Sequence, residues 1–595
     1  MKAVPGHKVP GSGVARPERR SSSTGLRRGS VCWDVAAVSG IGRLVPGLVV
    51  LRGYRRGWLG GDLTAGVTVA AYLVPQVMAY AVIAGVQPVA GLWAMLPSLL
   101  LYAVFGSSRL LSVGPESTTA LMTATVVGPL AGGDPVRYAE LAAMLAVVVG
   151  LVALVAWCLR LGFVADMLSY PILVGYMTGV ALIMMVGQLG KVIGVPLHGS
   201  GFFAELASFG RGLHETQAAT LALAAAALAF LFAIQHWFPH WPGPLLAMLL
   251  ATGTVAVFGL DHSGVALVGD IPSGLPLPSF PPVSDAGDLL LPALGVLVVG
   301  YTDNVLTGRA FAARDGGRNV DPTQELLALG LANAGAGLFR GFPVSSSGSR
   351  TAIIAAAGGR SQAGSLVAFA CVVCVLLFLH PVLARFPLAV LGSIVIYAAV
   401  RLIDVAGFRK LARFRWSELL LAIAALGGVL AFDILYGILV AVGLSVADLL
   451  RRVARPHDAV LGLVPGLAGM HDVDDYPSAR TIPGLLVYRY DSPLFFANAQ
   501  DFARRARQAI EDQDEPVEWF VLNVEAVVEV DITALNAVDE LRADLTARGI
   551  TFGLARVKQD LMNDLKAFGI AQAIGPDLLF PTLPTAVEAF QNSRS

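Results

Sequence analysis

The stretch GFPVSSSGSRTAII, residues 341–354, places four serines and one arginine inside a strongly apolar part of the chain. A second polar stretch, SVGPESTTALM at residues 112–122, stands in a similar apolar setting. Each leads into an apolar run, 346–358 and 115–131, that is shorter than the roughly 20 residues needed to cross a bilayer. The two stretches therefore predict helices that begin inside the membrane.

The composition of the whole chain is typical of a membrane protein. Of its 595 residues, 55% are hydrophobic and 14% are charged, and the mean hydropathy is +0.68. A soluble protein carries roughly 25% charged residues. The net charge is zero, which argues against a nucleic-acid partner. The four cysteines lack the spacing of a disulfide framework or a metal site, so we expect no metal and no cofactor.

Fourteen apolar runs predict fourteen transmembrane segments in contact with the lipid bilayer. They centre on residues 63–85, 89–105, 115–131, 139–158, 168–190, 218–238, 243–260, 289–312, 324–339, 346–358, 362–380, 388–403, 416–432 and 434–450. An odd number of segments in each half inverts the second half relative to the first. The two short segments are then the third of each half, and such pairs indicate the substrate site of a transporter.

The basic residues of the loops predict the orientation. If the amino terminus is cytoplasmic, the inside loops hold thirteen of them: Arg109, Arg160, Arg314, Arg318, Arg360, Arg401, Arg409, Lys410, Arg413, Arg415, Arg451, Arg452 and Arg455. The outside loops hold five: Arg137, Lys191, Arg211, Arg340 and Arg385. Cytoplasmic loops carry the excess of Lys and Arg. We therefore expect a multi-pass protein of the inner or plasma membrane with both termini in the cytoplasm.

Changes in composition divide the chain into four regions. Residues 1–58 form a basic cytoplasmic arm that we expect to be disordered. Residues 59–455 form the transmembrane domain, and residues 456–480 a linker. Residues 481–595 alternate the strand-like runs GLLVYRY, WFVLNV and TFGLARV with helical stretches, which predicts a soluble α/β domain. This domain shows no nucleophile–base pair, so we expect no enzyme and no catalytic residues.

The chemistry of the interrupted segments fits a small anion. Opposed half-helices 115–131 and 346–358 direct the positive ends of two helix dipoles toward one point. Arg350 adds a full charge, and hydroxyl donors precede it: Ser345, Ser346, Ser347 and Ser349. The competing interpretation is that Arg350 ties two helices together through backbone carbonyls or through Asp303.

Other polar residues at membrane depth are few. Pro75 breaks the first segment, and Gln76 directly after it is placed to supply an amide donor, with Tyr80 one turn further on. Glu116 lies in the first turn of the third segment, where a helix dipole stabilises a carboxylate. It is either a helix cap or part of a coupling site.

Asp303 lies in the middle of a predicted segment, VGYTDNVLTGRAF at residues 298–311. Thr307 follows four residues later and therefore shares its helix face. An acid at membrane depth indicates a proton relay or part of a cation site.

Two long stretches of the chain resemble the SulP family of anion permeases. These are residues 73–122, which cover the first three segments, and residues 320–353, which cover the ninth and tenth; the end of the chain resembles a STAS domain. The resemblance implies two inverted seven-helix repeats forming core and gate subdomains, an elevator-like motion and a homodimer. It implies an anion site on four residues: Gln76, Tyr80, Ser349 and Arg350. It implies an acid of the eighth segment at Asp303.

The implied function is secondary active transport, by symport, of sulfate or a similar inorganic anion, with a proton or sodium as the coupling ion. One alternative is a sodium-coupled bicarbonate transporter. Another is an anion channel or a membrane-anchored STAS signalling protein, and a protein that binds the STAS domain is a further partner left open. The chain also departs from its relatives. Glu116 replaces an aromatic residue of animal members, and Ile532 stands at the serine of phosphorylated STAS domains, with Thr533 next to it.

The predicted orientation can be tested by cysteine labelling. We expect a cysteine at Ser284 to react with an impermeant reagent from outside the cell, and a cysteine at Asn592 to react only from inside, because the loop charges place them on opposite sides. The reverse accessibility would contradict the topology.

Overall fold

The structure is a computed structural model, and it describes residues 44–166, 169–196, 201–238, 241–282, 286–312 and 320–594. Residues 1–43 of the predicted basic arm, and Ser284 in the predicted outside loop, lie outside the described residues. The prediction of disorder is wrong for the end of the arm, because Pro46–Arg52 form a helix that packs against the helix Val89–Phe105.

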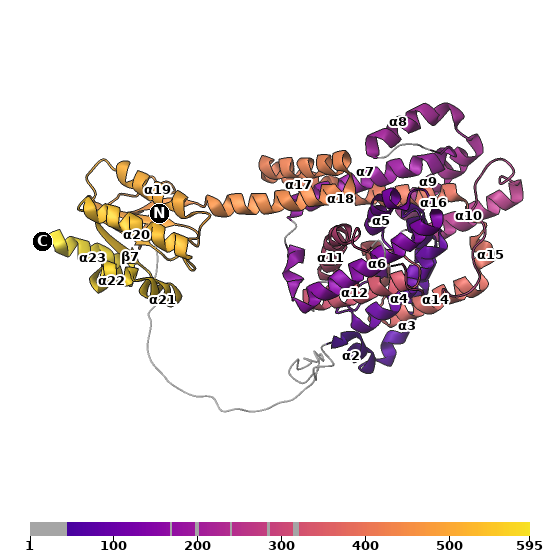
Figure 1. The fold of residues 1–595 in the computed structure, drawn as a ribbon, viewed down its shortest axis with the longest axis horizontal. Coiled ribbons are helices and arrows are strands. Elements are labelled where there is room, and N and C mark those ends of the chain that lie inside the picture. Colours follow the sequence, from indigo (N-terminus) through magenta and orange to yellow (C-terminus); the bar gives the residue numbers. More distant parts are fainter. Residues whose placement is uncertain are drawn as a thin grey trace, which may run out of the picture. The chain divides into compact units, whose positions relative to one another are not determined.

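Between residues 46 and 454 the described part of the chain is mainly helical (Figure 1). The helices of this region are α2 (Pro46–Arg52), η2 (Arg56–Trp58), α3 (Leu59–Ile83), α4 (Val89–Phe105), α5 (Ser117–Ala131), α6 (Pro135–Cys158), η3 (Leu161–Asp166), α7 (Tyr170–Ile193), α8 (Phe202–Gly212), η4 (Leu213–Glu215), α9 (Ala218–Trp237), α10 (Gly243–Phe258), α11 (Leu290–Ala312), α12 (Pro322–Leu338), α13 (Gly348–Ala356), α14 (Ala363–Phe378), α15 (His380–Leu383), α16 (Leu388–Leu402), α17 (Val405–Phe414) and α18 (Trp416–Ala454).

Six stretches within the described part of the chain are long and apolar enough to cross a membrane. They are Arg56–Ile83, Pro135–Cys158, Tyr170–Ile193, Ala218–Trp237, Leu290–Ala312 and Leu388–Phe414. Shorter apolar helices lie at Val89–Phe105, Gly243–Phe258, Ala363–Phe378 and Trp416–Phe432. Each predicted segment except the last two coincides with one helix. The sequence did not predict α8 and α17, whose mixed polar and apolar residues fit a surface position better than a span.

Local sequence signals explain where several helices begin. Asp134 accepts hydrogen bonds from the backbone N–H groups of Val136 and Arg137, and Pro135 occupies the first turn of α6. Asp321 caps α12 in the same way, directly before Pro322. A proline in the first turn loses no hydrogen bond, because the first N–H groups of a helix have no partner within it.

The last two predicted segments fall within one helical element, α18, yet the chain reverses inside it. Arg452 Nη2 lies 3.4 Å from Glu418 Oε1. A straight helix would separate residues 34 positions apart by about 50 Å. A Cβ atom added to Gly437 would lie 2.7 Å from the Cα atom of Val429, so the two arms pack closely. The arms of α18 are therefore antiparallel, as expected for two separate segments.

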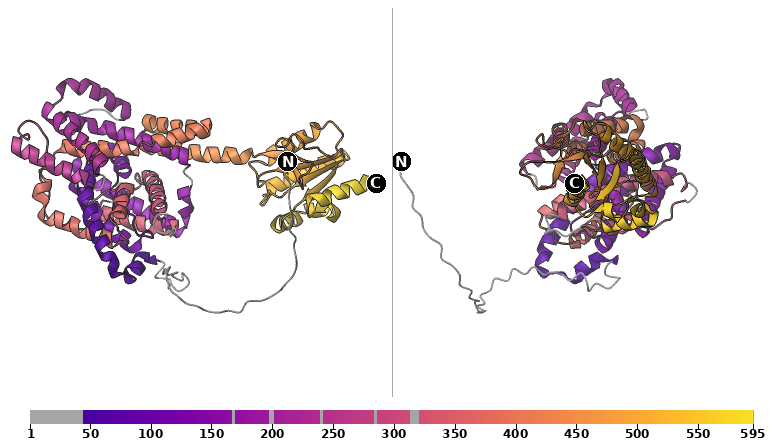
Figure 2. Two further views of the ribbon diagram at one scale, coloured as in Figure 1. Left: turned by 180° about the vertical axis from the view of Figure 1, so that it is seen from behind. Right: turned by 90° about the vertical axis from the view of Figure 1, so that its left-hand side faces the viewer.

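The carboxy-terminal part contains a six-stranded sheet of order β4-β3-β5-β6-β7-β8 (Figures 1 and 2). Its strands are β3 (Asp458–Leu463), β4 (Met470–Asp472), β5 (Leu485–Tyr490), β6 (Trp519–Asn523), β7 (Thr551–Ala555) and β8 (Leu579–Phe580). From β5 to β8 neighbouring strands are parallel, whereas β3 pairs antiparallel with β4 and β5. The helices are α19 (Ala499–Glu511), α20 (Ile532–Ala547), α21 (Gln559–Phe568), α22 (Ile570–Ile574), η6 (Pro576–Leu578) and α23 (Leu583–Arg594).

Both faces of this sheet are covered. On β5, Leu486 and Tyr488 join the apolar core that contains Phe502 of α19, while Leu485 and Val487 join the core that contains Phe590 of α23. Alternate residues of a strand point to opposite faces. The predicted α/β domain is thus a sheet between two helical layers.

The expected linker at residues 456–480 is wrong in one respect, because it holds β3 and β4. Asp458 pairs with Tyr490 and Leu461 with Val487, so these residues extend the sheet. The strands were missed because β4 has only three residues and a turn-rich segment lies between the two. Gly569, whose φ of 92° is left-handed, separates α21 from α22.

The reversal of α18 can be tested with a matched pair of glycine substitutions. We expect Gly437→Ala to lower the thermal unfolding midpoint, because the new Cβ overlaps backbone atoms of Val429 and overpacking costs about 1–3 kcal/mol. Gly427→Ala is the control, since nothing lies within 4 Å of the added atom and the helix gains roughly 0.5–1 kcal/mol. Equal midpoints for the two variants would contradict the antiparallel packing.

Candidate anion site

Two short strands join the interrupted segments in the middle of the helical region. β1 (Val113–Gly114) pairs antiparallel with β2 (Ser345–Ser346), with Val113 opposite Ser346 and Gly114 opposite Ser345. The ladder packs tightly against α4 at Gly114, because a Cβ atom there would lie 2.2 Å from Met95 Sδ and would displace that side chain. Because the strands run in opposite directions, α5 and α13 leave the ladder in opposite directions and their amino ends meet at it.

Each half-helix is capped by its own side chain. The Glu116 carboxylate accepts the backbone N–H of Thr118 at 2.7 Å and the hydroxyl of Ser117. The Ser347 hydroxyl accepts the N–H of Arg350 at 3.5 Å and shares a hydrogen bond of 3.1 Å with Ser349. Glu116 therefore acts as a helix cap, and its negative charge offsets the positive end of α5.

Arg350 is completely buried beside the ladder. Its Nε donates to Ser112 Oγ at 3.2 Å, and its Nη1 donates to the carbonyl oxygen of Pro115 at 2.8 Å. Nη2 has no hydrogen-bond partner among the described residues. The arginine thus ties α13 to the segment before α5, as the competing interpretation requires, and keeps one nitrogen available for a ligand.

Gln76 and Tyr80 lie on α3, which packs against α5 and α13. Both side chains are buried, and Gln76 Nε2 donates to the Tyr80 hydroxyl at 2.8 Å. Gln76 Oε1 has no partner in the described part of the chain. The predicted break at Pro75 is wrong, because α3 runs through it from Leu59 to Ile83. A proline removes one helical hydrogen bond, and neighbouring helices can hold the kinked helix together.

Asp303 lies on α11, which packs against β2 and both half-helices. Its Oδ2 accepts a hydrogen bond of 2.9 Å from the Ser346 hydroxyl, in the ladder itself. Thr307, one turn further on, lies beside the start of α13, since a Cβ atom on Gly348 would be 3.9 Å from Thr307 Cγ2. The structure therefore brings Asp303 and Thr307 to the same place as the Arg350 cluster.

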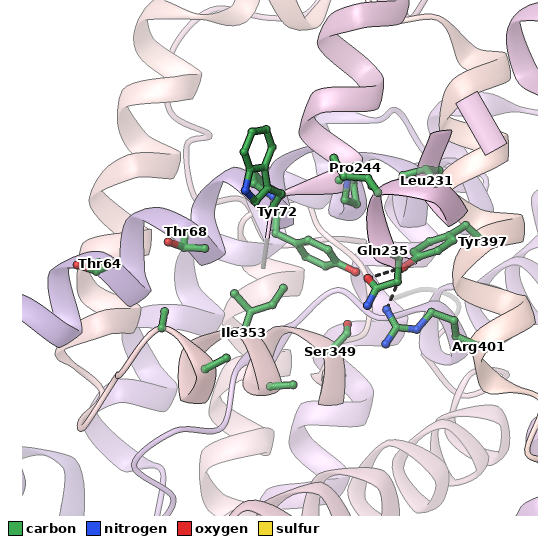
Figure 3. Close-up of a pocket in the computed structure, with 17 residues that line it drawn as sticks. Thr64, Thr68, Tyr72, Leu231, Gln235, Pro244, Ser349, Ile353, Tyr397 and Arg401 are labelled. Atoms are coloured by element: carbon green, nitrogen blue, oxygen red, sulfur yellow. Dashed lines mark hydrogen bonds between the residues drawn. The ribbon is translucent and has the colours of Figure 1, made fainter. Parts of the chain in front are cut away.

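A cavity of about 400 Å³ opens beside Ser349 (Figure 3). Its polar lining includes Tyr72 of α3, Gln235 of α9, and Tyr397 and Arg401 of α16. The Tyr397 hydroxyl donates to Gln235 Oε1 at 2.9 Å and accepts from Arg401 Nη1 at 3.1 Å. Ser349 thus connects the candidate site to a space between α3, α9, α13 and α16.

The sequence reasoning missed the buried acid Glu325, in the first turn of α12. Its carboxylate accepts hydrogen bonds from the Tyr102 hydroxyl at 3.0 and 2.9 Å, from Ser107, and from Asn304 Nδ2 at 2.6 Å. Through these hydrogen bonds the Glu325 carboxyl group joins α4, α11 and α12. Its position near a helix start looks like an ordinary dipole-favoured acid, so the sequence carried no distinguishing signal.

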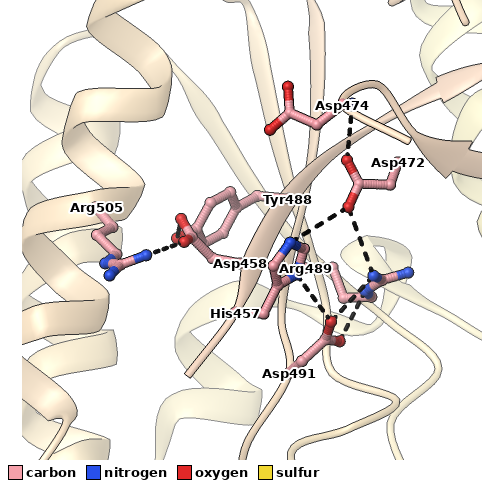
Figure 4. A network of polar contacts seen from close by, with 8 residues as sticks. All are labelled: His457, Asp458, Asp472, Asp474, Tyr488, Arg489, Asp491 and Arg505. Carbon is pink, nitrogen blue, oxygen red and sulfur yellow. Dashed lines mark hydrogen bonds and ion pairs between the residues drawn. The ribbon is translucent and has the colours of Figure 1, made fainter. Parts of the chain in front are cut away.

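A second polar network lies at the edge of the carboxy-terminal sheet (Figure 4). His457 lies 3.7 Å from Asp472 and 3.4 Å from Asp491, and Arg489 Nε lies 2.7 Å from Asp491 Oδ1. These residues come from β4, β5 and the segments beside them, so the network fastens the edge of the sheet.

Tyr488, on β5, belongs to the same region of the sheet. Its hydroxyl donates to Asp458 Oδ2 at 2.6 Å. Burial, followed by this hydrogen bond, raises the pKa of the Tyr488 hydroxyl above its ordinary value. Tyr488 therefore stays neutral, and we assign this part of the sheet a structural role.

Ile532 is the first residue of α20, and 70% of its surface is exposed. The preceding residue, Asp531, accepts the N–H of Ala534 at 2.8 Å and caps the helix. The position that carries a serine in phosphorylated relatives is therefore exposed, but it has no hydroxyl to modify.

The fold and the site are those of a membrane transporter with a carboxy-terminal α/β domain. The pattern of the Sulfate permease family matches residues 59–425, and that of the STAS domain matches residues 476–586. The chain therefore belongs to the sulfate permease family, whose members are transporters and not enzymes, and it carries a STAS domain.

Individual relatives agree with this assignment. A protein of Mycobacterium tuberculosis named "Probable sulfate transporter" is 56% identical over 548 residues, which is 92% of this chain and 98% of the relative. "Probable sulfate transporter 4.2" of Arabidopsis thaliana is 32% identical over 89% of this chain and 80% of its own length.

Two solved structures share the fold. Murine solute carrier 26 family member A9, an anion transporter in its inward-facing state, matches with a TM-score of 0.87 at 22% identity, over 97% of this chain and 100% of the mouse chain. The transmembrane domain of a cyanobacterial bicarbonate transporter matches with a TM-score of 0.58 at 24% identity, over 66% of this chain and 98% of the other.

Proposed function

We propose that this protein is a secondary active transporter of sulfate or a similar inorganic anion. The observation that carries the proposal is Arg350, a completely buried cation with one nitrogen unpartnered among the described residues. A buried charge is costly unless it is paired, so this nitrogen calls for an anionic ligand. The name of the 56% identical relative from Mycobacterium tuberculosis supports sulfate as that ligand.

The anion is held between α5 and α13. Arg350 supplies the full charge, while Ser347, Ser349 and the first N–H groups of α13 supply further donors. Gln76 contributes an amide donor. Gln76 Oε1 has no partner among the described residues, and a 180° flip of the side-chain amide would place the NH₂ group there, where it could donate to the anion. Tyr80 holds that amide in place through their hydrogen bond.

Coupling is assigned to Asp303, with Thr307 and Glu116. Ser346 links the Asp303 carboxylate directly to β2, so a proton or a sodium ion bound there acts on the anion site through a single hydrogen bond. Glu116 contributes in the same way, because loss of its charge would free the N–H of Thr118 at the amino end of α5. Entry of the ion and the anion together gives symport.

The transport cycle is an elevator-like motion of a core subdomain against a gate subdomain. Fourteen segments form two inverted repeats, each with one interrupted helix, so the site lies where the repeats meet. Both termini face the cytoplasm, and the functional unit is a homodimer. Residues 481–595 regulate transport or bind another protein through the STAS domain.

The decisive experiment is uptake into proteoliposomes, run separately for sulfate and for bicarbonate under imposed proton or sodium gradients. Concentrative sulfate uptake supports the proposal. Uptake of bicarbonate driven only by sodium would favour a bicarbonate transporter, and passive flux without coupling would favour a channel. Absence of flux for every anion would leave a membrane-anchored STAS signalling protein.

Arg350 can be tested by substitution. We expect Arg350→Ala to weaken sulfate binding roughly 10- to 150-fold, because a charge-assisted contact is worth about 1.5–3 kcal/mol. Arg350→Lys should restore part of the affinity, since an ammonium lacks the planar fork. The measurement is the sulfate dependence of binding and uptake.

The matched control for Arg350 is Ser112→Ala, which removes one structural hydrogen bond of the guanidinium and keeps the charge. Thermal unfolding is measured for every variant. If Arg350→Ala binds sulfate as well as Ser112→Ala does, the arginine is only an interhelical tie.

Asp303 can be tested in the same vesicles. Asp303→Asn should abolish gradient-driven accumulation while the protein still folds, because the amide cannot carry the coupling charge. Glu140→Gln, which neutralises an exposed acid on α6, is the control. Accumulation by Asp303→Asn with an unchanged ion dependence would show that the acid is structural.

A further inference from the structure

We propose that Arg401, together with Tyr397 and Gln235, forms a second anion subsite. The anion binds there transiently on its way between the Arg350 site and the cytoplasm. This inference rests on the proposed function and names a residue that the Arg350 site does not include. Figure 3 shows these three side chains and Ser349 around one cavity.

The first observation is the charge of the cavity. Among the described residues that line it, Arg401 is the single charged side chain, and the remaining ones are apolar, hydroxyl-bearing or amide-bearing. Arg401 makes no ion pair with a carboxylate elsewhere in the described chain. A cation at the wall of a low-dielectric cleft with no acid opposite it concentrates anions.

The second observation is how Arg401 is held. Its Nη1 donates to the Tyr397 hydroxyl, which in turn donates to Gln235 Oε1. The guanidinium carbon also lies 5.7 Å from the centre of the Tyr397 ring. These contacts are to neutral groups, so they orient the guanidinium without cancelling its charge. The other nitrogens of Arg401 and the amide nitrogen of Gln235 remain as donors.

The third observation is continuity with the first site. Ser349, which shares a hydrogen bond with the α13 cap Ser347, lines the same cavity as Arg401. The cavity volume of about 400 Å³ corresponds to roughly a dozen water molecules at about 30 Å³ each. An oxyanion that keeps part of its hydration shell fits this space. Arg401 itself is exposed, so the subsite suits a ligand that exchanges readily.

The location agrees with a role on the cytoplasmic face. Arg401 ends α16, and the next helix, α17, carries Arg409, Lys410 and Arg413. By the predicted orientation, this is the side on which basic loops collect. The subsite would therefore receive the anion as it leaves Arg350 for the cytoplasm, or collect it for the reverse step.

The test measures sulfate half-saturation at each face of proteoliposomes, with sulfate varied on one side at a time. Arg401→Gln should raise the value at the cytoplasmic face about fivefold or more and leave the other face unchanged, because one unit charge is lost near a solvated ion. Arg401→Lys should behave like the unaltered protein. Arg409→Gln, which removes an exposed charge from α17, is the matched control and should also show no effect.

A second readout follows binding rather than transport. Ile353→Cys, on the cavity wall, should be protected from a thiol reagent by sulfate, and addition of Arg401→Gln should abolish that protection. The inference is overturned if protection persists, if both faces change equally, or if Arg401→Gln matches Arg409→Gln. These outcomes leave sulfate uptake and the effect of Arg350→Ala intact, so failure of the subsite differs from failure of the proposed function.

Discussion

Backbone polar groups inside a bilayer have no water to bond, and the site of this protein is organised around that constraint. α5 and α13 begin at the ladder inside the packed helical region, so the extended residues before them must find partners within the protein. The backbone N–H and C=O groups of β1 and β2 pair with each other across the ladder. The side chain of Asn333 bonds both backbone groups of Val344, at 2.9 Å each, and Ser347 N–H donates to the carbonyl of Ser112 at 2.9 Å.

The same partners that satisfy the backbone also shape the proposed anion site. The carbonyl oxygen of Pro115 lies before the start of α5, and it accepts a hydrogen bond from the guanidinium of Arg350. The arginine is therefore structural and electrostatic at once, because two of its nitrogens stabilise the ladder while the third stays available. Glu116 follows β1 and caps α5, and Asp303 accepts a hydrogen bond from Ser346 of β2. A change of charge on either acid would therefore alter the electrostatic potential at the point where the amino ends of α5 and α13 meet.

Away from the ladder, the surrounding helices play a different part. Glu325 joins α4, α11 and α12 by accepting hydrogen bonds from Tyr102 and Asn304. Because its oxygens already have protein donors, its role is to support the helices rather than to bind a ligand. The cavity at Ser349 lies elsewhere, between α3, α9, α13 and α16.

The sequence alone determined the membrane class, the positions of most helices, the two interrupted segments and the importance of Arg350. These properties depend on local composition and length, because a bilayer selects long apolar runs and makes each polar residue within them conspicuous. Asp134 and Asp321 likewise mark helix starts through contacts with the next three residues. The STAS strands β5, β6 and β7 were visible because they are buried apolar runs.

Only the tertiary structure decided how these parts meet. The hydrogen-bond partners of Arg350, Ser112 and Pro115, lie more than two hundred positions away in the chain. The same holds for Glu325, which looks like an ordinary helix-start acid until Tyr102 lies beside it. Arg401 was counted only as a loop charge, because a cavity with no opposing acid is a property of several helices together and not of any one stretch of chain.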